Sequence, residues 1–355
     1  MTTNHKYYLN LAFEIAKKNL GKTKLNPSVG VVVVKNNSII STGVTSPSGR
    51  PHAEFNALNK KDNFAGADLY TTLEPCTHYG LTPPCVDIIV KKKIKNVYYG
   101  FEDPDHRTFK KAKIFLKNKK IKALLKKSKK FDNFYSSYFL NKKFKMPYIT
   151  AKIAVSNDFY TINKKTRWIT NNRSRKITHL LRSRNDCIFS TSKSINIDNS
   201  LLNCRIDGLT SYQPDLFIID MGLKLKKNLL LNKIINKRSN YLITTDTNNK
   251  KAIFFKKRGY KVIFIKSLKS KNDFNILFKK IYELGYGRIF FEAGLTFLNS
   301  LLNYKLLNNL YIFQNRKKLK KNGFNNSHLK YLKKIDLKNK INVNLENDNL
   351  YKIEF

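Results

Sequence analysis

Hydrophobic positions in the first part of the chain follow helix-like and strand-like spacing in turn. Over residues 5–20 they recur on one helical face, which predicts a helix ending at a glycine. Residues 31–34 are consecutive valines, a run typical of a buried strand, and residues 38–44 form the expected hairpin partner after an Asn-Asn turn. The pattern indicates a layered α/β unit, with further strands over 68–73 and 96–100 and a further helix over 85–92.

An aromatic segment closes this unit. Its rings recur at helical spacing beside lysines, at Phe131, Phe134, Tyr135, Tyr138 and Phe139. Aromatic and basic residues together can stack on nucleic-acid bases, but helical spacing favours a stripe that faces the protein core. A short linker is expected over 142–147, with a boundary near residue 145, which predicts domains over 1–145 and 146–355.

The second half of the chain alternates apolar runs with helical segments, which predicts a largely parallel sheet. Glu292-Ala293-Gly294 follows one expected strand and opens an apolar helix, so a phosphate or a ring could approach the backbone at Gly294. Beyond residue 311 only 351–355 has a strand-like pattern. The expected strands lie at 148–155, 186–190, 216–220, 241–245, 261–265 and 288–292, with helices at 172–184 and 295–302.

Composition narrows the class of protein. A chain of 355 residues that is 41% hydrophobic suits two domains, each with its own core. No run is apolar enough to span a bilayer, so no membrane partner is expected, and residues 1–8 lack the apolar segment of a signal peptide. We therefore expect a cytoplasmic location. Cys187 and Cys204 are then expected to pack in the core rather than to form a disulfide.

The formal net charge of +45 raises the question of a nucleic-acid partner. Lysines are spread through both halves of the chain, together with abundant Asn, Ile, Phe and Tyr. This distribution indicates a general compositional bias rather than a binding stripe. We therefore expect no specific nucleic-acid partner, only weak and salt-sensitive affinity for polyanions.

The segment from Pro51 to Cys85 carries the candidate chemistry. His52, Cys76 and Cys85 are a sufficient ligand set for a catalytic zinc ion with one open position, and Glu54 is placed to move protons. A purely structural zinc site would need a fourth protein ligand. His78 could supply it, but we favour a contact with substrate, a contact with a metal ligand or an exposed position for this histidine.

This His-x-Glu…Pro-Cys…Cys arrangement resembles the signature of zinc-dependent deaminases, with an unusually long loop between the cysteines. Together with motifs in the second half, it resembles the bifunctional deaminase–reductase family of riboflavin biosynthesis, over residues 5–305. The motifs that carry the resemblance are Asn26-Pro27-x-Val29-Gly30, Pro51-His52-Ala53-Glu54, Thr72-Leu73-Glu74-Pro75-Cys76, Thr82-Pro83-Pro84-Cys85, Asp103-Pro104, Trp168-Ile169-Thr170, Leu180-Leu181-Arg182, Ile219-Asp220 and Glu292-Ala293-Gly294.

The resemblance implies a cytidine-deaminase-like three-layer domain followed by a dihydrofolate-reductase-like α/β domain. It implies hydrolytic deamination of a diaminohydroxy-phosphoribosylamino-pyrimidine substrate, then reduction of the ribosyl group of the product to ribityl with NADPH. Zinc would activate water and Glu54 would shuttle the proton, while Asn26 would hydrogen-bond the substrate. We also expect a homo-oligomer.

For the second reaction the resemblance implies two sets of residues. NADPH would lie along Ala154, Trp168, Ser194, Asp198 and Gly294. The substrate would meet Lys152, Thr166, Arg182, Leu202, Arg205 and Glu292, where the arginines suit a phosphate because they are forked and permanently charged. Two less specific interpretations remain open: Arg182 could lie in solvent, and Lys152 could face outward from an edge strand.

The second half departs from the family pattern. The family's Ser-Leu-Asp-Gly-Arg/Lys stretch is here Ser156-Asn157-Asp158-Phe159-Tyr160, and a Pro-x-Leu-Gly segment after Phe313 is replaced by polar and basic residues. A phenylalanine in place of glycine can obstruct a cofactor where the backbone has positive φ. One alternative is therefore a deaminase with a non-catalytic, reductase-like scaffold domain. A tRNA or other nucleic-acid base deaminase is a further alternative, which the charge favours and the long cysteine loop does not.

Overall fold

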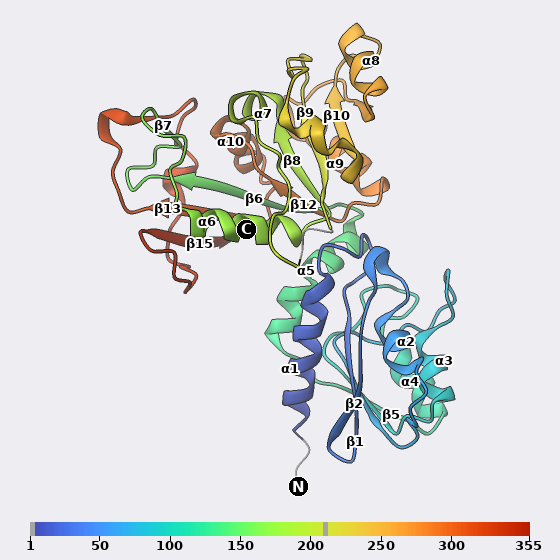
Figure 1. Cartoon of the computed structure of the whole chain (residues 1–355). Helices are drawn as coiled ribbons and strands as arrows, with labels where there is room; N and C mark the ends of the chain where they lie inside the picture. Colours follow the sequence, from blue (N-terminus) through green and yellow to red (C-terminus); the bar gives the residue numbers. More distant parts are fainter. Residues whose placement is uncertain (1–3, 209–211) are drawn as a thin grey trace. The chain divides into compact units, whose positions relative to one another are not determined.

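The computed structural model describes residues 4–208 and 212–355, and it divides into two compact units, Met1–Met146 and Pro147–Phe355. Figure 1 draws the helices and strands of both. The division falls one residue after the boundary expected from the sequence. Each unit has its own sheet, and the two are described separately.

The first unit contains a five-stranded sheet in the order β2-β1-β3-β4-β5. Strand β1 pairs antiparallel with β2 and β3, whereas β3, β4 and β5 run parallel. The valines of β1 are buried, as their continuous run predicted. The strands are β1 (Gly30–Lys35), β2 (Ser38–Val44), β3 (Asp68–Thr71), β4 (Asn96–Tyr99) and β5 (Lys122–Leu125).

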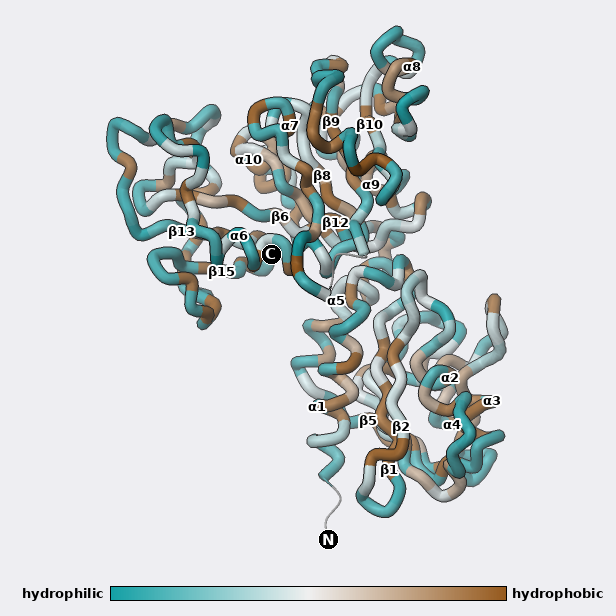
Figure 2. Tube along the Cα trace, in the orientation of Figure 1, coloured by the Kyte–Doolittle hydropathy of each residue, from teal (hydrophilic) through white to brown (hydrophobic). Residues whose placement is uncertain are grey.

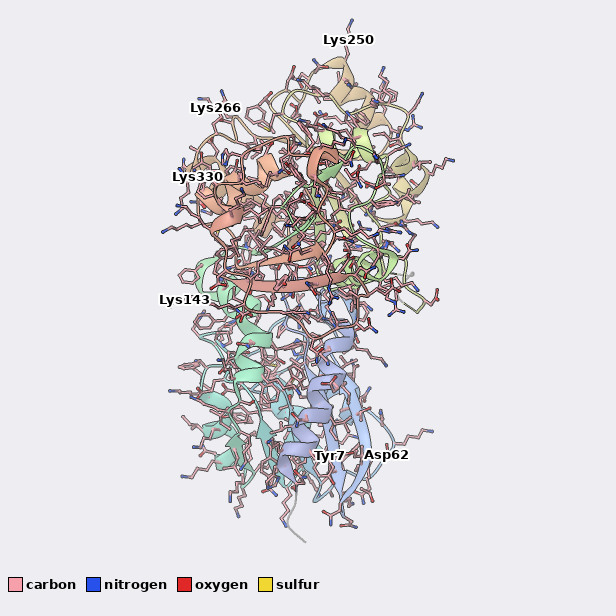
Figure 3. All side chains as sticks on the ribbon, turned by 90° about the vertical axis from the view of Figure 1, so that its left-hand side faces the viewer. Tyr7, Asp62, Lys143, Lys250, Lys266 and Lys330 are labelled. Carbon is pink, nitrogen blue, oxygen red and sulfur yellow. The ribbon has the colours of Figure 1, made fainter. Side chains whose placement is uncertain are left out.

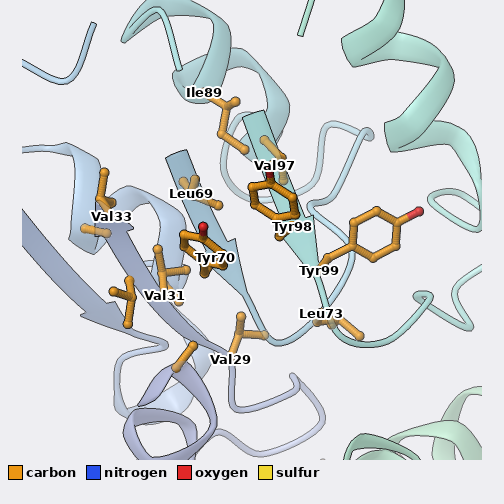
Figure 4. Packing of buried hydrophobic residues seen from close by; sticks show 14 of the residues in the cluster. Val29, Val31, Val33, Leu69, Tyr70, Leu73, Ile89, Val97, Tyr98 and Tyr99 are labelled. Atoms are coloured by element: carbon orange, nitrogen blue, oxygen red, sulfur yellow. The ribbon is translucent and has the colours of Figure 1, made fainter. Parts of the chain in front are cut away.

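Helices cover both faces of this sheet (Figure 1). Helix α1 packs with α5 through Phe13, whose ring centroid lies 5.6 Å from that of Phe131. Figure 4 shows the sheet residues beneath, where Tyr70 and Tyr98 stack at 4.9 Å beside valines of β1. The helices are α1 (His5–Ala16), α2 (Ala53–Leu58), α3 (Cys85–Lys91), α4 (Lys111–Asn118) and α5 (Lys129–Phe144).

The last helix of the first unit is longer than the sequence indicated. Residues 142–144, expected to lie in a linker, are the final turn of α5. The aromatic stripe of this helix does face the core at Phe131, Tyr135 and Tyr138, which are buried, whereas Phe139 is 42% exposed.

The second unit contains an eight-stranded sheet in the order β11-β10-β9-β8-β12-β6-β13-β15. All neighbouring pairs are parallel except β13 and β15, so the predicted parallel sheet is confirmed. Strand β13 was not predicted, and β7 (Ile162–Asn163) and β14 (Gly323–Phe324) form a separate two-stranded ribbon. The main strands are β6 (Tyr148–Val155), β8 (Cys187–Thr191), β9 (Asp215–Ile219), β10 (Asn240–Thr244), β11 (Tyr260–Phe264), β12 (Arg288–Phe291), β13 (Asn309–Asn315) and β15 (Asp348–Glu354).

Successive side chains of the second sheet alternate between two hydrophobic layers. Ile188 packs with residues of α7 and α8 on one face, whereas Phe291 meets Phe278 of α9 and Phe297 of α10 on the other. In Figure 2 strands β8 and β9 carry hydrophobic, brown stretches, while the peripheral loops are mostly teal. The helices are α6 (Asn172–Ser183), α7 (Ser192–Asp198), α8 (Lys250–Lys257), α9 (Lys271–Glu283) and α10 (Leu295–Asn303).

The lysines that dominate the charge extend outward from both units. Figure 3 labels Lys143, Lys250, Lys266 and Lys330, all of which are exposed. Over the described ranges 4–208 and 212–355, no helix combines the length and the apolar character needed to cross a bilayer.

Candidate functional site

The predicted metal ligands come together from three elements of the first unit. His52 is the N-cap of α2, Cys85 is the first residue of α3, and Cys76 lies in the loop after β3. The Nδ1 atom of His52 is 3.3 Å from the Cys85 Sγ and 3.6 Å from the Cys76 Sγ. Tetrahedral zinc with ordinary bond lengths separates a nitrogen and a sulfur ligand by about 3.6 Å. Both distances are close to this value, and the three ligand atoms all lie within 4.8 Å of one another, so the three side chains fit a zinc ion.

The pKa values of the two cysteines shift in opposite directions. The Cys85 amide at the N-terminus of α3 donates to the Cys76 Sγ at 3.2 Å, and Cys76 itself lies in the loop after β3. The hydrogen bond from the Cys85 thiol, with support from His52, lowers the pKa of Cys76 to about 4. The same thiol–thiolate bond and burial raise the pKa of Cys85.

Glu54 lies beside the ligands and is 3% exposed. Its Oε2 lies 3.3 Å from the Cys85 Sγ. Burial, and next the charge of Cys76, raise the pKa of Glu54. A buried carboxyl group with a raised pKa can both accept and return a proton near neutral pH, which is the behaviour required of a general acid–base.

A pocket opens above these residues, and both Asn26 and His78 line it. His78 bonds Thr108 Oγ1 through Nδ1 at 3.0 Å and lies outside the group of potential metal ligands. Behind Asn26 stands Gly49, buried and at φ +90°. A Cβ atom on Gly49 would lie 2.3 Å from Asn26 Nδ2, so the glycine leaves the space that the amide occupies.

Sequence reasoning missed a charged network at the pocket rim. The Asp105 carboxylate accepts two bonds from the Arg107 guanidinium, at 2.9 and 2.6 Å, and one from Lys142 Nζ at 2.9 Å. These cations, Arg107 first, hold the pKa of Asp105 far below its usual range. Neighbouring Asp103 accepts from Tyr138 at 3.0 Å, while burial raises its pKa to about 7. The Asp103-Pro104 motif was the only sequence signal for this network.

In the second unit Arg182 and Glu292 form a buried ion pair, each 10% exposed. Arg182 Nε and Nη2 donate to the two carboxylate oxygens at 2.5 and 2.9 Å, and Nη1 donates to the Asn203 carbonyl at 2.8 Å. Burial would raise the pKa of Glu292, but Arg182 and Lys152 lower it overall. The interpretation of Arg182 as a solvent-exposed side chain is therefore wrong.

Lys152 lies on β6, which runs between β12 and β13. The interpretation of Lys152 as a residue of an edge strand is therefore also wrong. Its burial lowers the pKa of the amine, and the charges that act on it come from Glu292, Arg182 and Asp198. An amine with a lowered pKa near a carboxylate is a typical feature of a reaction centre.

The remaining reductase candidates lie in smaller groups. Ser194 Oγ is 3.9 Å from the position of a Cβ on Gly294, and half-buried Ala154 lies on β6. Thr166 Oγ1 donates to the Trp168 carbonyl at 3.0 Å, and both residues are exposed.

The Trp168 ring lies near two guanidinium groups, and one of them, from Arg167, also donates to the Asp198 carbonyl. Leu202 is buried at φ +46°, whereas Arg205 is exposed and donates to the Asn203 side chain.

The departure from the family pattern at Phe159 coincides with a strained turn. Phe159 N donates to the Ser156 carbonyl at 3.0 Å, and Ser156 N donates to the Tyr160 carbonyl at 2.9 Å. This is a tight turn followed by a left-handed residue, a position that favours glycine. Phe159 occupies it at φ +63°. The chain thus keeps the turn geometry and accepts the strain of a bulky side chain.

In comparisons with known proteins, the two units of the chain match two different families. Residues 2–101 match the family described as "Cytidine and deoxycytidylate deaminase zinc-binding region", and residues 147–317 match the "RibD C-terminal domain". The riboflavin biosynthesis protein RibD of Aquifex aeolicus is 33% identical over 316 residues, which covers 87% of this chain and 86% of the relative. RibD of Bacillus amyloliquefaciens is 36% identical over 223 residues, or 61% of this chain and 59% of that protein.

A solved structure of Acinetobacter baumannii RibD superimposes with a TM-score of 0.83 at 25% identity, covering 99% of this chain and 98% of the other. The predicted fold class, a deaminase-like unit followed by a reductase-like α/β unit, is confirmed. The chain therefore belongs to the RibD family of riboflavin biosynthesis proteins.

Proposed function

We propose that this chain is the bifunctional enzyme that performs two consecutive steps of riboflavin biosynthesis. The first is zinc-dependent hydrolytic deamination of 2,5-diamino-6-(5-phosphoribosylamino)pyrimidin-4(3H)-one, and the second is NADPH-dependent reduction of the ribosyl group of the product to ribityl. The observation that carries the proposal is the convergence of His52, Cys76 and Cys85 beside the buried Glu54.

In the deaminase unit His52, Cys76 and Cys85 would hold zinc, which when bound supplies a Lewis acid that activates water. Glu54 takes the proton released from that water and gives it to the ring nitrogen. After the carbon–oxygen bond has formed, Glu54 takes the remaining proton of the new hydroxyl group and transfers it to the exocyclic amine. The carbon–nitrogen bond then breaks, ammonia leaves, and the hydroxyl oxygen becomes the carbonyl of the product. Asn26 lines the pocket, where its side chain occupies the space that a side chain at position 49 would otherwise fill, and it would hydrogen-bond the pyrimidine.

In the reductase unit bound NADPH would supply the hydride, and Ala154, Trp168, Ser194, Asp198 and Gly294 would line its site. The Arg182–Glu292 ion pair indicates that the two arginines of the proposed substrate site have different roles. Arg182 is engaged by Glu292 and Asn203, so it positions the carboxylate. Exposed Arg205 is the cation that would meet the phosphate, and Thr166, Leu202 and Lys152 complete the proposed substrate site, with Lys152 beside the reacting ribose.

A homo-oligomeric state and a cytoplasmic location complete the proposal. Size-exclusion chromatography and cell fractionation test the two statements.

The strained turn at Phe159 favours one second candidate, a deaminase whose reductase-like unit is only a scaffold. Sequential assays separate the two. Substrate alone should release ammonia, and later addition of NADPH should give a fall in NADPH absorbance. Ammonia release without any NADPH oxidation would leave the scaffold interpretation in place.

Metal analysis of Cys76→Ser and Cys85→Ser proteins tests the zinc site, because full zinc retention in both would contradict it.

A further inference from the structure

Three basic side chains line the deaminase pocket: Arg50, Arg107 and Lys142. Two of them are already neutralised, since Arg107 and Lys142 share the Asp105 carboxylate. An anion that approached this part of the rim would meet the negative charge of Asp105 as well as the two cations. The Asp105 cluster is therefore a poor place for a second anion.

Arg50 differs because no carboxylate in the described ranges lies within ion-pair distance of it. Its Nη1 atom is 2.9 Å from Thr82 Oγ1, which holds the guanidinium against the loop between the two cysteines. The same nitrogen is 3.2 Å from Nε2 of His52. Arg50 is half-buried, so its charge is partly removed from solvent without a counter-ion.

The contact between Arg50 and His52 changes character when the metal site is filled. Nδ1 of His52 faces the two sulfur atoms, so Nε2 carries the ring proton in the loaded site. Metal-bound histidines ordinarily donate this proton to a carboxylate, a carbonyl or water. Here the neighbour is a guanidinium, which is itself a donor. Two donors 3.2 Å apart cannot bond each other, but both can bond one anionic oxygen placed between or above them.

We propose that Arg50 recognises the phosphate of the substrate in the deaminase pocket, as a specificity-determining residue. This inference rests on the proposed function, which supplies a phosphorylated substrate to this pocket. A guanidinium suits the task because it presents a rigid fork to phosphate oxygens. When zinc is bound, Nε2 of His52 carries a proton and can no longer accept a hydrogen bond from Arg50, so the guanidinium is free to bind phosphate. Phosphate recognition therefore depends on the metal, although the phosphate does not bind the metal.

The test compares deamination of the phosphorylated substrate with that of the same compound lacking the phosphate. In Arg50→Gln protein, kcat/KM for the phosphorylated substrate should fall by about 10- to 100-fold, the usual value of a charge-assisted bond. For the phosphate-free compound it should change by no more than about twofold. Arg50→Lys should be intermediate, because it keeps the charge and loses the fork. Zinc content should stay at the wild-type level in both variants.

Arg107→Gln is the control within the same pocket, and it should keep the wild-type preference for phosphate because its guanidinium is committed to Asp105. A binding measurement complements the kinetics. In Arg205→Gln protein, which keeps the deaminase pocket intact, calorimetric titration with ribose 5-phosphate should detect binding to the zinc-loaded form. That binding should be weaker after zinc removal and lost on adding Arg50→Gln.

An unchanged preference for phosphate in Arg50→Gln would overturn the inference, as would a loss of preference in Arg107→Gln alone. Equal affinity of the zinc-loaded and zinc-free forms for ribose 5-phosphate would overturn the metal dependence. A wild-type protein that releases ammonia from neither compound would instead refute the proposed function.

Discussion

Replacing Gly49 with alanine tests whether the pocket depends on the position of Asn26. Gly49 lies at φ +90°, and a Cβ there would come within 2.3 Å of Asn26 Nδ2 and 2.6 Å of Asn26 Cβ. Real atoms cannot approach so closely, so the asparagine side chain must move out of its present position. The substitution combines backbone strain with displacement of a residue proposed to bind the pyrimidine.

Gly66 provides a matched control in the same unit. It lies at φ +76°, and a Cβ there would meet nothing within 4 Å. Left-handed backbone costs an alanine roughly 1–2 kcal/mol, so Gly66→Ala should lose stability of about this size in urea unfolding. Gly49→Ala should lose at least as much, because the clash with Asn26 adds to the backbone strain. Only Gly49→Ala should also lose catalysis, by about 10- to 100-fold in kcat/KM for deamination, since a displacement of about 1 Å can have that effect.

Steady-state ammonia release gives kcat/KM for each of the two variants, and urea titration gives the free energy of unfolding of each. Gly66→Ala should retain wild-type kcat/KM. If Gly49→Ala deaminates as fast as Gly66→Ala, Asn26 has no part in substrate binding and the reasoning fails.

The remaining predictions address the acid–base residue and the second unit. Glu54→Gln should keep its zinc and lose deamination by roughly 10²–10⁴-fold, so a variant that retains more than a few per cent of the wild-type rate would place the base elsewhere. Phe159→Gly should stabilise the second unit by about 1 kcal/mol in urea unfolding, because it relieves the left-handed strain at φ +63°, and a loss of stability would contradict this. Arg182→Met should cost about 3–5 kcal/mol near neutral pH, because it leaves the Glu292 carboxylate buried without its partner. The pKa of Glu292 is lowered in the folded protein, so the pair stabilises the fold above the ordinary carboxyl pKa and this contribution is lost as pH falls through the lowered value. The difference between wild type and Arg182→Met should therefore shrink in acid, and a difference that grows there would refute the assignment.

Local patterns predicted the elements that present the metal ligands. The valine run of β1 and the Pro-Cys start of α3 are short local signals that each determine one element. The metal site could therefore be predicted from the positions of Cys76 and Cys85 relative to these elements. Cys76 lies in the loop after β3, and the N-terminus of α3 reaches its sulfur through the Cys85 amide.

Contacts between distant residues were beyond this kind of reasoning. Lys142 joins Asp105 from 37 positions away, and Arg182 finds Glu292 from 110 positions away. Whether Lys152 lies on a central or an edge strand depends on which strands pair with β6, and that is decided by residues more than one hundred positions later. Strand β13 was missed because its apolar core of four residues is too short to distinguish from other apolar runs.

The order of strands also has a consequence for how the chain folds during synthesis. In the first unit, sheet neighbours lie close together in the sequence, in the order β2-β1-β3-β4-β5, so this sheet can assemble while later residues are still being added. In the second unit β6 is made first, yet its partners β12 and β13 begin at Arg288 and Asn309. Until those residues leave the ribosome, β6 has two open edges that can pair with other nascent chains. We therefore expect chaperone dependence and aggregation during overproduction to arise in the second unit, and a fragment ending before Arg288 to be insoluble.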